Sequence, residues 1–341
     1  MTASGRNVKM AKKGLLYILT AALMMGALTG CKQNVGTPED NAVVEEPEEE
    51  NDDVQTNRLF GFSGADLSDP FCEVIKDSVS VSLEEQGDRI LVRDAAKDAG
   101  TQAEQIREMI DAGAEAVFLI PADPVEITPA LESLKEAEIP VINLDIRVQD
   151  TGLTDAYIGA DNYSAGAYCA EDLIRRMPDG GTVGIIECTG NSSVAERING
   201  FEESIQNAGF EIKGRINTAP DDEAGLKREL LSMLDDEQPP DALMCGDDRM
   251  ALIVMEALRT SGRSDIIVYS VGGSPAVKSA LKETDSALAG IGALSPINMG
   301  KTAVKTASAL LADGAYEPEI YVETFFIDRE NIDMYGTDGW Q

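Results

Sequence analysis

Short apolar runs alternate with segments of helical spacing from Arg58 onward, and this alternation limits the possible fold more than any other feature of the sequence. Strands that are separated by helices pair in parallel, because a parallel pair needs a long crossover connection. The alternation restarts after Tyr163, and ten strands in one open sheet would be unusual. We therefore predict an α/β fold with two doubly wound parallel-sheet lobes of about five strands each.

The predicted strands are short and apolar, and they lie at residues 58–62, 89–92, 116–120, 141–144, 156–158, 182–187, 211–216, 242–245, 266–270 and 287–291. The predicted helices show apolar residues at helical spacing, and they lie at residues 71–86, 101–112, 127–137, 163–177, 194–208, 225–234, 249–260, 275–281 and 297–312. A strand-like run at residues 320–326 and a polar tail follow the last helix.

The chain is strongly acidic, with a formal charge of -33 over 341 residues. Residues 1–31 carry +4 and residues 32–57 carry -8, which leaves -29 on the rest of the chain. So acidic a body repels phosphate backbones and anionic lipid head groups. We therefore expect no nucleic acid as a partner, and we expect any attachment to a membrane to use a lipid.

The chain contains no histidine. This excludes a Ser-His-Asp triad, an HExxH zinc site and a histidine proton shuttle. The sequence Gly61-Phe62-Ser63-Gly64 after the first strand matches neither GxGxxG nor GxxxxGK[ST], and the adjacent Asp247 and Asp248 cannot flank a glycosidic bond. We expect a protein that is not an enzyme and uses no cofactor or metal; a nucleotide-dependent α/β enzyme is the alternative from a different class.

Residues 1–30 are predicted to be a secretory signal peptide. Four basic residues precede an apolar run at residues 14–28, and they are Arg6, Lys9, Lys12 and Lys13. The run is shorter than the roughly 20 residues that a membrane-spanning helix needs. Translation starts at Met1 or at Met10, since either start leaves a basic segment before the apolar run.

The segment Leu28-Thr29-Gly30-Cys31 resembles the lipobox of bacterial lipoproteins. The resemblance implies cleavage before Cys31 and lipidation of its sulfur, so that two or more acyl chains give a stable anchor. Residues 31–57 hold nine acidic residues and no aromatic one, which is typical of a disordered tether. We expect a lipid-anchored protein on the extracytoplasmic face of the cell membrane.

Four further cysteines, Cys72, Cys169, Cys188 and Cys245, are expected to be buried free thiols. Cys188 and Cys245 end neighbouring predicted strands, so a disulfide between these two is the one pairing left open.

Polar loops follow most of the predicted strands, and ligands of open parallel sheets bind beyond the carboxyl ends of the strands. These loops begin at Ser63, Asp145, Gly159, Thr189, Gly246 and Gly272. Their side chains suit hydrogen bonding to a small hydroxylated molecule, and Phe71 offers an apolar stacking face.

Several of these segments resemble type I periplasmic binding proteins of the ribose and galactose group, over residues 58–326. The resemblance is carried by Ser68-Asp69-Pro70-Phe71, Ile139-Pro140-Val141-Ile142-Asn143-Leu144-Asp145, Ile158-Gly159-Ala160-Asp161-Asn162, Ala195-Glu196-Arg197-Ile198-Asn199-Gly200-Phe201 and Gly246-Asp247-Asp248-Arg249-Met250-Ala251. It implies two lobes joined by a hinge of three crossings, near residues 161–162, 293–295 and 321–323. The N-terminal lobe would comprise residues 58–161 and 296–321, and the C-terminal lobe residues 162–293 and 323–341.

The resemblance also implies which residues contact a ligand, and these are Asp69, Phe71, Asp145, Arg197 and Asp247. Arg147 and Asn191 are added because they follow the fourth and sixth predicted strands. Asp69 could instead be only a helix N-cap, Phe71 a core residue and Arg197 a solvated helical residue. Asp248 is interpreted as a cap and not as a ligand group.

This sequence departs from the family pattern at several ligand positions. Ile146 stands where ribose-type members have arginine, Cys72 and Pro220 stand near two expected aromatic residues, and Gly272 replaces an expected aspartate. The resemblance implies the family fold and a sugar-binding role in an ABC importer, whose permease would recognise the closed form. The departures leave the ligand open among monosaccharides, polyols, nucleosides and signalling furanoses. A sensory protein that presents its closed form to a membrane receptor is the alternative among binding proteins.

Overall fold

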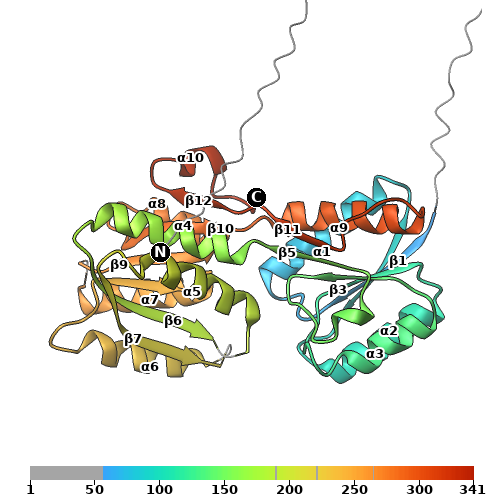
Figure 1. Ribbon diagram of the computed structural model, residues 1–341, viewed down its shortest axis with the longest axis horizontal. Helices are drawn as coiled ribbons and strands as arrows, with labels where there is room; N and C mark the ends of the chain where they lie inside the picture. The colour runs from blue at the N-terminus through green and yellow to red at the C-terminus, as the bar shows by residue number, and fades with distance from the viewer. Residues whose placement is uncertain (1–56, 189, 220–221, 264) are drawn as a thin grey trace, which may run out of the picture. The chain divides into compact units, whose positions relative to one another are not determined.

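The computed structural model describes residues 57–188, 190–219, 222–263 and 265–341. These residues form two six-stranded sheets covered by helices (Figure 1), which confirms the predicted α/β fold of two lobes. We call each sheet, together with the helices that pack on it, a lobe. The predicted signal peptide, Cys31 and nearly all of the tether lie outside the described residues. Within the described ranges, no helix combines the length and the apolar character that crossing a membrane requires.

The N-terminal lobe contains six parallel strands in the order β11-β5-β4-β3-β1-β2. The strands are β1 (Leu59–Gly64), β2 (Arg89–Asp94), β3 (Ala116–Leu119), β4 (Val141–Leu144), β5 (Ala156–Ala160) and β11 (Glu319–Val322). The helices are α1 (Pro70–Glu84), α2 (Ala99–Asp111), α3 (Thr128–Glu136) and α9 (Pro296–Leu311), with a short 3-10 helix η1 (Thr151–Leu153).

Alternate side chains of the central strand β3 point to opposite faces of the N-terminal sheet, as the period of two in a strand requires. Phe118 packs in one apolar cluster with Ile75 of α1, whereas Val117 packs in a second cluster with Met109 of α2. The strands β3, β4 and β5 are buried along their whole length. Continuous apolar strands are therefore explained by helices that cover both faces.

The C-terminal lobe has the strand order β12-β10-β9-β8-β6-β7, in which only β12 is antiparallel to its neighbour. The strands are β6 (Gly181–Cys188), β7 (Phe210–Thr218), β8 (Ala242–Cys245), β9 (Ile267–Gly272), β10 (Leu288–Ala293) and β12 (Phe325–Asp328). The helices are α4 (Asn162–Arg176), α5 (Ser192–Ile205), α6 (Glu223–Leu234), α7 (Asp248–Ser261), α8 (Pro275–Lys282) and α10 (Ile332–Tyr335).

The described chain passes between the two sheets three times, at Asp161, at residues 294–295 and at residues 323–324. The first two passages lie where the sequence places them. The third lies slightly later than predicted, because the run at residues 320–326 is divided: β11 pairs with β5, and β12 pairs with β10. For the same reason each sheet has six strands and not about five.

The four described cysteines are buried free thiols, as predicted. The strands β6 and β8 are neighbours, but their register places Cys245 opposite Ile186, while Cys188 lies opposite Thr218 of β7. The disulfide between Cys188 and Cys245 that the sequence left open does not form.

Candidate functional site

Six of the seven predicted site residues follow the carboxyl ends of strands, and the seventh lies on α5. Asp69 and Phe71 follow β1, Asp145 and Arg147 follow β4, Asn191 follows β6, Asp247 follows β8, and Arg197 lies in the second turn of α5. Because the carboxyl ends of parallel strands meet at one edge of a sheet, each lobe brings its own set of these residues to one edge.

Asp145 is held in an unusual backbone conformation, with φ at 58°. Its backbone nitrogen donates to the Ile158 oxygen (3.0 Å), and its backbone oxygen accepts from the Tyr157 hydroxyl (2.7 Å). Its Oδ1 atom is buried and accepts no hydrogen bond from the described residues. A non-glycine residue in the left-handed region costs about 1 kcal/mol or more, and such strain concentrates at ligand sites.

Burial raises the pKa of the Asp145 carboxyl to about 6. The positive charge of Arg197 acts in the opposite direction, and the nearby negative charge of Asp69 raises the pKa further. Arg197 lies in the C-terminal lobe, whereas Asp69 and Asp145 lie in the N-terminal lobe. The two lobes therefore bring a carboxylate and a guanidinium close enough to influence each other.

Arg197 is a buried, hydrogen-bonded side chain, with only 7% of its surface exposed. Its Nε donates to Asn162 Oδ1 (2.8 Å), and its Nη1 donates to the Gly246 oxygen at the end of β8 (2.9 Å). The other amide atom of Asn162, Nδ2, is buried and donates to no group among the described residues. Arg197 is thus neither solvated nor free to swing away.

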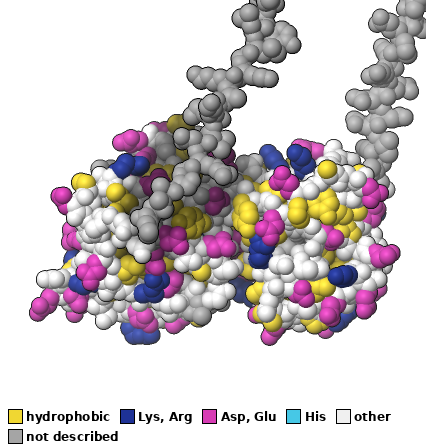
Figure 2. Space-filling view, viewed as in Figure 1, with side chains coloured by type: hydrophobic (Ala, Val, Ile, Leu, Met, Phe, Trp, Pro, Cys, Tyr) yellow, Lys and Arg dark blue, Asp and Glu magenta, His cyan; other side chains and the backbone are white. Residues whose placement is uncertain are grey.

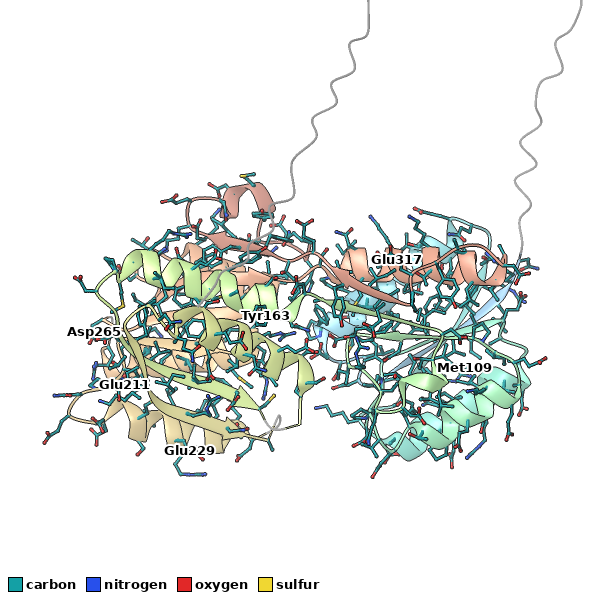
Figure 3. All side chains as sticks on the ribbon, viewed as in Figure 1. Met109, Tyr163, Glu211, Glu229, Asp265 and Glu317 are labelled. Atoms are coloured by element: carbon teal, nitrogen blue, oxygen red, sulfur yellow. The ribbon has the colours of Figure 1, made fainter. Side chains whose placement is uncertain are left out.

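The helices α4 and α5 pack with their backbones in contact, which fixes the positions of Asn162 and Arg197. A Cβ atom on Gly166 would lie 1.8 Å from the Arg197 oxygen, and one on Gly200 would lie 2.0 Å from the Tyr163 oxygen. Tyr163, labelled in Figure 3, also donates from its hydroxyl to Glu203 Oε2 on α5 (2.8 Å). Only glycine allows so close an approach.

Asp145 Oδ1 and Asn162 Nδ2 are a buried acceptor and a buried donor that lack partners in the described chain. Leaving such groups unpaired costs about 1–3 kcal/mol each, so buried orphan atoms call for a partner. A hydroxyl group both donates and accepts a hydrogen bond, and it satisfies either atom. The arrangement suits a small neutral molecule that carries several hydroxyl groups.

Three predicted site residues are also helix N-caps. Asp69 Oδ1 accepts from the backbone nitrogens of Phe71 (2.8 Å) and Cys72 (3.2 Å). Asn191 Oδ1 and Asp247 Oδ1 cap α5 and α7 in the same way. An N-cap satisfies a free backbone donor of the helix, and in each of these residues the capping contact uses only the Oδ1 atom.

Asp248 is not a helix cap, contrary to the interpretation from sequence. Asp247 caps α7, and the buried Asp248 instead accepts from Ser270 Oγ (2.7 Å) and from the backbone nitrogens of Gly273 (2.9 Å) and Ser274 (2.7 Å). Burial raises the pKa of Asp248. Its role is to tie the start of α7 to the loop after β9.

Arg147 points to the edge strand β11. Its Nη1 donates to Glu319 Oε1 (2.6 Å), its Nη2 donates to the Tyr321 hydroxyl (2.8 Å), and its guanidinium carbon lies 3.9 Å from the centre of the Tyr157 ring. The hydrogen bonds of the Arg147 side chain are therefore made with the edge strand β11.

Phe71 is half-buried and contacts the only tryptophan of the chain. The rings of Phe71 and Trp340 are 5.3 Å apart between centroids and inclined at 69°. Sequence reasoning assigned no role to Trp340, and it placed Asn162 in the polar segment after the fifth predicted strand without selecting it as a site residue. Asn162 follows a predicted strand and could have been found by its position, whereas the polar tail gave no sign that Trp340 would fold back onto α1.

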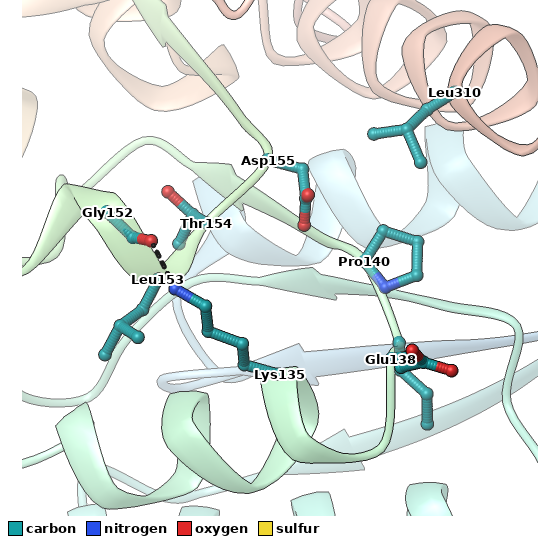
Figure 4. A pocket seen from close by; sticks show the side chains of 9 residues that line it. Lys135, Glu138, Pro140, Gly152, Leu153, Thr154, Asp155 and Leu310 are labelled. Carbon is teal, nitrogen blue, oxygen red and sulfur yellow. Dashed lines mark hydrogen bonds between the residues drawn. The ribbon is translucent and has the colours of Figure 1, made fainter. Parts of the chain in front are cut away.

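Two hollows of the described surface lie away from these residues. The hollow in Figure 4 is lined by Lys135, residues 138–140 and 152–155, and Leu310, which lie at the amino ends of β4 and β5. A second is lined by residues from the ends of α6 and α7. Figure 2 shows acidic and basic side chains scattered over both lobes. Neither of the two hollows is lined by a residue of the candidate site.

Comparison with known proteins gives a match to the family described as periplasmic binding protein domain over residues 60–315. The chain is 26% identical to the ribose import binding protein of Bacillus subtilis over 304 residues, covering 88% of this chain and 93% of the relative. It is 29% identical to the D-ribose/D-allose-binding protein of Pseudomonas aeruginosa over 228 residues, covering 64% of this chain and 71% of the relative.

Solved structures share the fold. An ABC transporter solute binding protein from Bacillus halodurans, solved with bound myo-inositol, gives a TM-score of 0.73 at 23% identity and covers 82% of this chain and 97% of its own. A Caulobacter myo-inositol binding protein gives a TM-score of 0.71 at 24% identity, with 82% and 95% covered.

Proposed function

The chain belongs to the periplasmic binding protein domain family, and on that premise we propose that it is the substrate-binding protein of an ABC importer. Its ligand is a small neutral hydroxylated molecule, and a monosaccharide fits best. The family is one of binding proteins, so no reaction is assigned to the chain.

One observation carries the choice of ligand class: the buried atoms Asp145 Oδ1 and Asn162 Nδ2 lack partners, and both lie near Arg197. A charged anion would be repelled by Asp69, Asp145 and Asp247, whereas a sugar offers hydroxyl groups to all of them. The names of the relatives, which include ribose and allose, support a monosaccharide. The cyclic polyol myo-inositol has the same chemistry, and its occurrence in a protein of the same fold makes it a second probe.

The mechanism is closure of the two lobes on the ligand. Asp69, Phe71 and Asp145 come from one lobe, and Asn162, Arg197 and Asp247 from the other, so one ligand completes its hydrogen bonds only when both lobes reach it. A ligand that binds the closed form better shifts the population toward that form. The permease then recognises the closed shape; a sensory receptor would recognise it in the same way.

A thermal-shift screen of the purified chain tests the proposal, with ribose, D-allose, other pentoses and hexoses, myo-inositol, nucleosides and amino acids as probes. A binder stabilises the folded protein by about 2.7 kcal/mol at a hundredfold excess over Kd. The Asp145→Asn variant should lose the shift. The matched control Asp111→Asn, at the exposed far end of α2, should keep it. A shift with amino acids alone would contradict the proposed ligand class.

The proposed attachment uses lipid on Cys31 and places the protein on the extracytoplasmic face of the cell membrane. The acidic composition of residues 32–57 supports a tether that holds the body away from an anionic surface. Fractionation of cells tests this directly. The wild-type chain should sediment with membranes and Cys31→Ser should not; equal sedimentation of both would exclude the lipid anchor.

A further inference from the structure

The segment that follows α10 returns to the carboxyl edges of the strands, where the candidate site lies. Ser295, just after β10, donates from Oγ to the backbone oxygen of Gln341 (2.6 Å). Gln341 Nε2 donates in turn to the Tyr335 oxygen (2.8 Å). The last residues of the chain are therefore fixed to the C-terminal lobe.

A buried lysine forms the second attachment of this segment. Lys278 of α8 has none of its surface exposed, and its ammonium donates to the Gly339 oxygen and to Gln341 Oε1 (2.9 Å for the latter). Burying an ammonium group is costly unless hydrogen bonds compensate it. The compensating hydrogen bonds here are made with Gly339 and Gln341, the residues before and after Trp340. Lys278 therefore fixes the backbone on both sides of Trp340.

The ring itself contacts the other lobe. Trp340, half-buried, meets Phe71 in the first turn of α1 with the two rings inclined at 69°. Rings at this inclination are in edge-to-face contact, which is a preferred arrangement of aromatic pairs, and the parts of the rings that the partner does not cover remain apolar surface. A sugar or cyclic polyol places its C–H groups against such faces.

We propose that Trp340 is a ligand-contacting residue, the second aromatic wall of the site, and that it sets specificity together with Phe71. The inference rests on the proposed function. Phe71 belongs to the N-terminal lobe and the segment of Trp340 is attached to the C-terminal lobe, so each lobe contributes one of the two rings.

The test combines calorimetry with fluorescence on the full chain, with ribose, D-allose and myo-inositol as probes. Trp340 is the only tryptophan, so the emission reports this position alone. A probe that binds by calorimetry should change the emission and protect it at least twofold from acrylamide quenching. Trp340→Ala should raise Kd about tenfold, and Trp340→Phe, which keeps a ring, should stay within about threefold of wild type.

Two further variants separate contact from folding. Met334→Ala, in the preceding helix α10 and 82% exposed, should leave Kd unchanged. Lys278→Met should release the segment, so that Trp340 is quenched more readily even without a probe. Binding by calorimetry without any change in wild-type emission, and with Trp340→Ala equal to wild type, would overturn the inference while leaving the proposed function in place. Absence of binding by any probe would overturn both.

Discussion

At the scale of single residues, Asp145 combines strain, burial and an unpaired oxygen, and each of these lowers stability. We expect Asp145→Asn to stabilise the protein by about 2–3 kcal/mol at pH 7, because a neutral amide avoids the burial of a charge. Asparagine also tolerates the left-handed conformation. Urea denaturation measures the gain, and the same variant should lose ligand binding. Unchanged or lower stability would show that the carboxylate has a partner.

The raised pKa of Asp145 also predicts a pH dependence. The pKa of about 6 lies above the unfolded value, so the folded state holds the proton more tightly between about pH 4 and pH 6. Stability should therefore fall as the pH rises through this window. Ligand binding should change in the opposite direction: an ionised Asp145 accepts from a hydroxyl, so Kd should rise by about tenfold per unit as the pH falls below 6. Calorimetry at pH 5 and pH 7 measures the change in Kd, and an equal Kd at both pH values would contradict it. For stability, Asp145→Asn is the control that should lack the pH dependence.

Single residues also show what cannot be predicted from the sequence alone. An aspartate before Pro70 predicts a helix cap, and Asp69 is one; the same pattern cannot distinguish a cap from a ligand contact. Arg197 followed from a motif, but its bonds to Asn162 and Gly246 depend on the packing of α4 against α5 and β8. Trp340 contacts a residue more than 250 positions earlier, which no local pattern encodes.

At the scale of elements, the crossing of α4 and α5 is the arrangement on which the site depends most. Gly166→Ala would place a methyl group 1.8 Å from the Arg197 oxygen, and backbone cannot yield as a side chain can. We expect a loss of about 1–3 kcal/mol and weaker binding, because Arg197 and Asn162 would move apart. Chemical denaturation and calorimetry measure the two effects.

The exposed Gly152→Ala, where a new Cβ lies 3.4 Å from Asp150 Oδ1, is the matched control and should have little effect. If Gly166→Ala lost stability and still bound the probe with wild-type Kd, the helix crossing would serve folding alone.

Most elements could be predicted from the sequence, because buried parallel strands are continuous apolar runs and their helices have a clear period. The exception is instructive. The run at residues 320–326 looks like one strand, yet β11 completes one sheet and β12 completes the other. The residues on both sides of residues 323–324 are mostly apolar, so composition does not mark a boundary there. The run is divided only because its two halves pair with strands of different sheets.

At the scale of the whole molecule, closure predicts a change in dimensions. Saturating the protein with a probe that it binds should reduce the radius of gyration measured by small-angle scattering. The reason is that the two lobes approach each other around the three crossings. Asp145→Asn at the same probe concentration should keep the larger value. A radius that stays constant with the wild-type chain saturated would mean that the ligand binds without closure.

The strand order also determines at what point during synthesis the folding of each lobe can be completed. The edge strands β11 and β12 lie between residues 319 and 328, yet they complete sheets that begin at residues 59 and 181. Neither sheet has its full set of strands until nearly all of the chain has been synthesised. Contacts between residues so far apart in sequence form slowly. A nascent chain of this topology therefore remains incompletely folded during elongation, which is compatible with the export that the signal peptide predicted at residues 1–30 would direct.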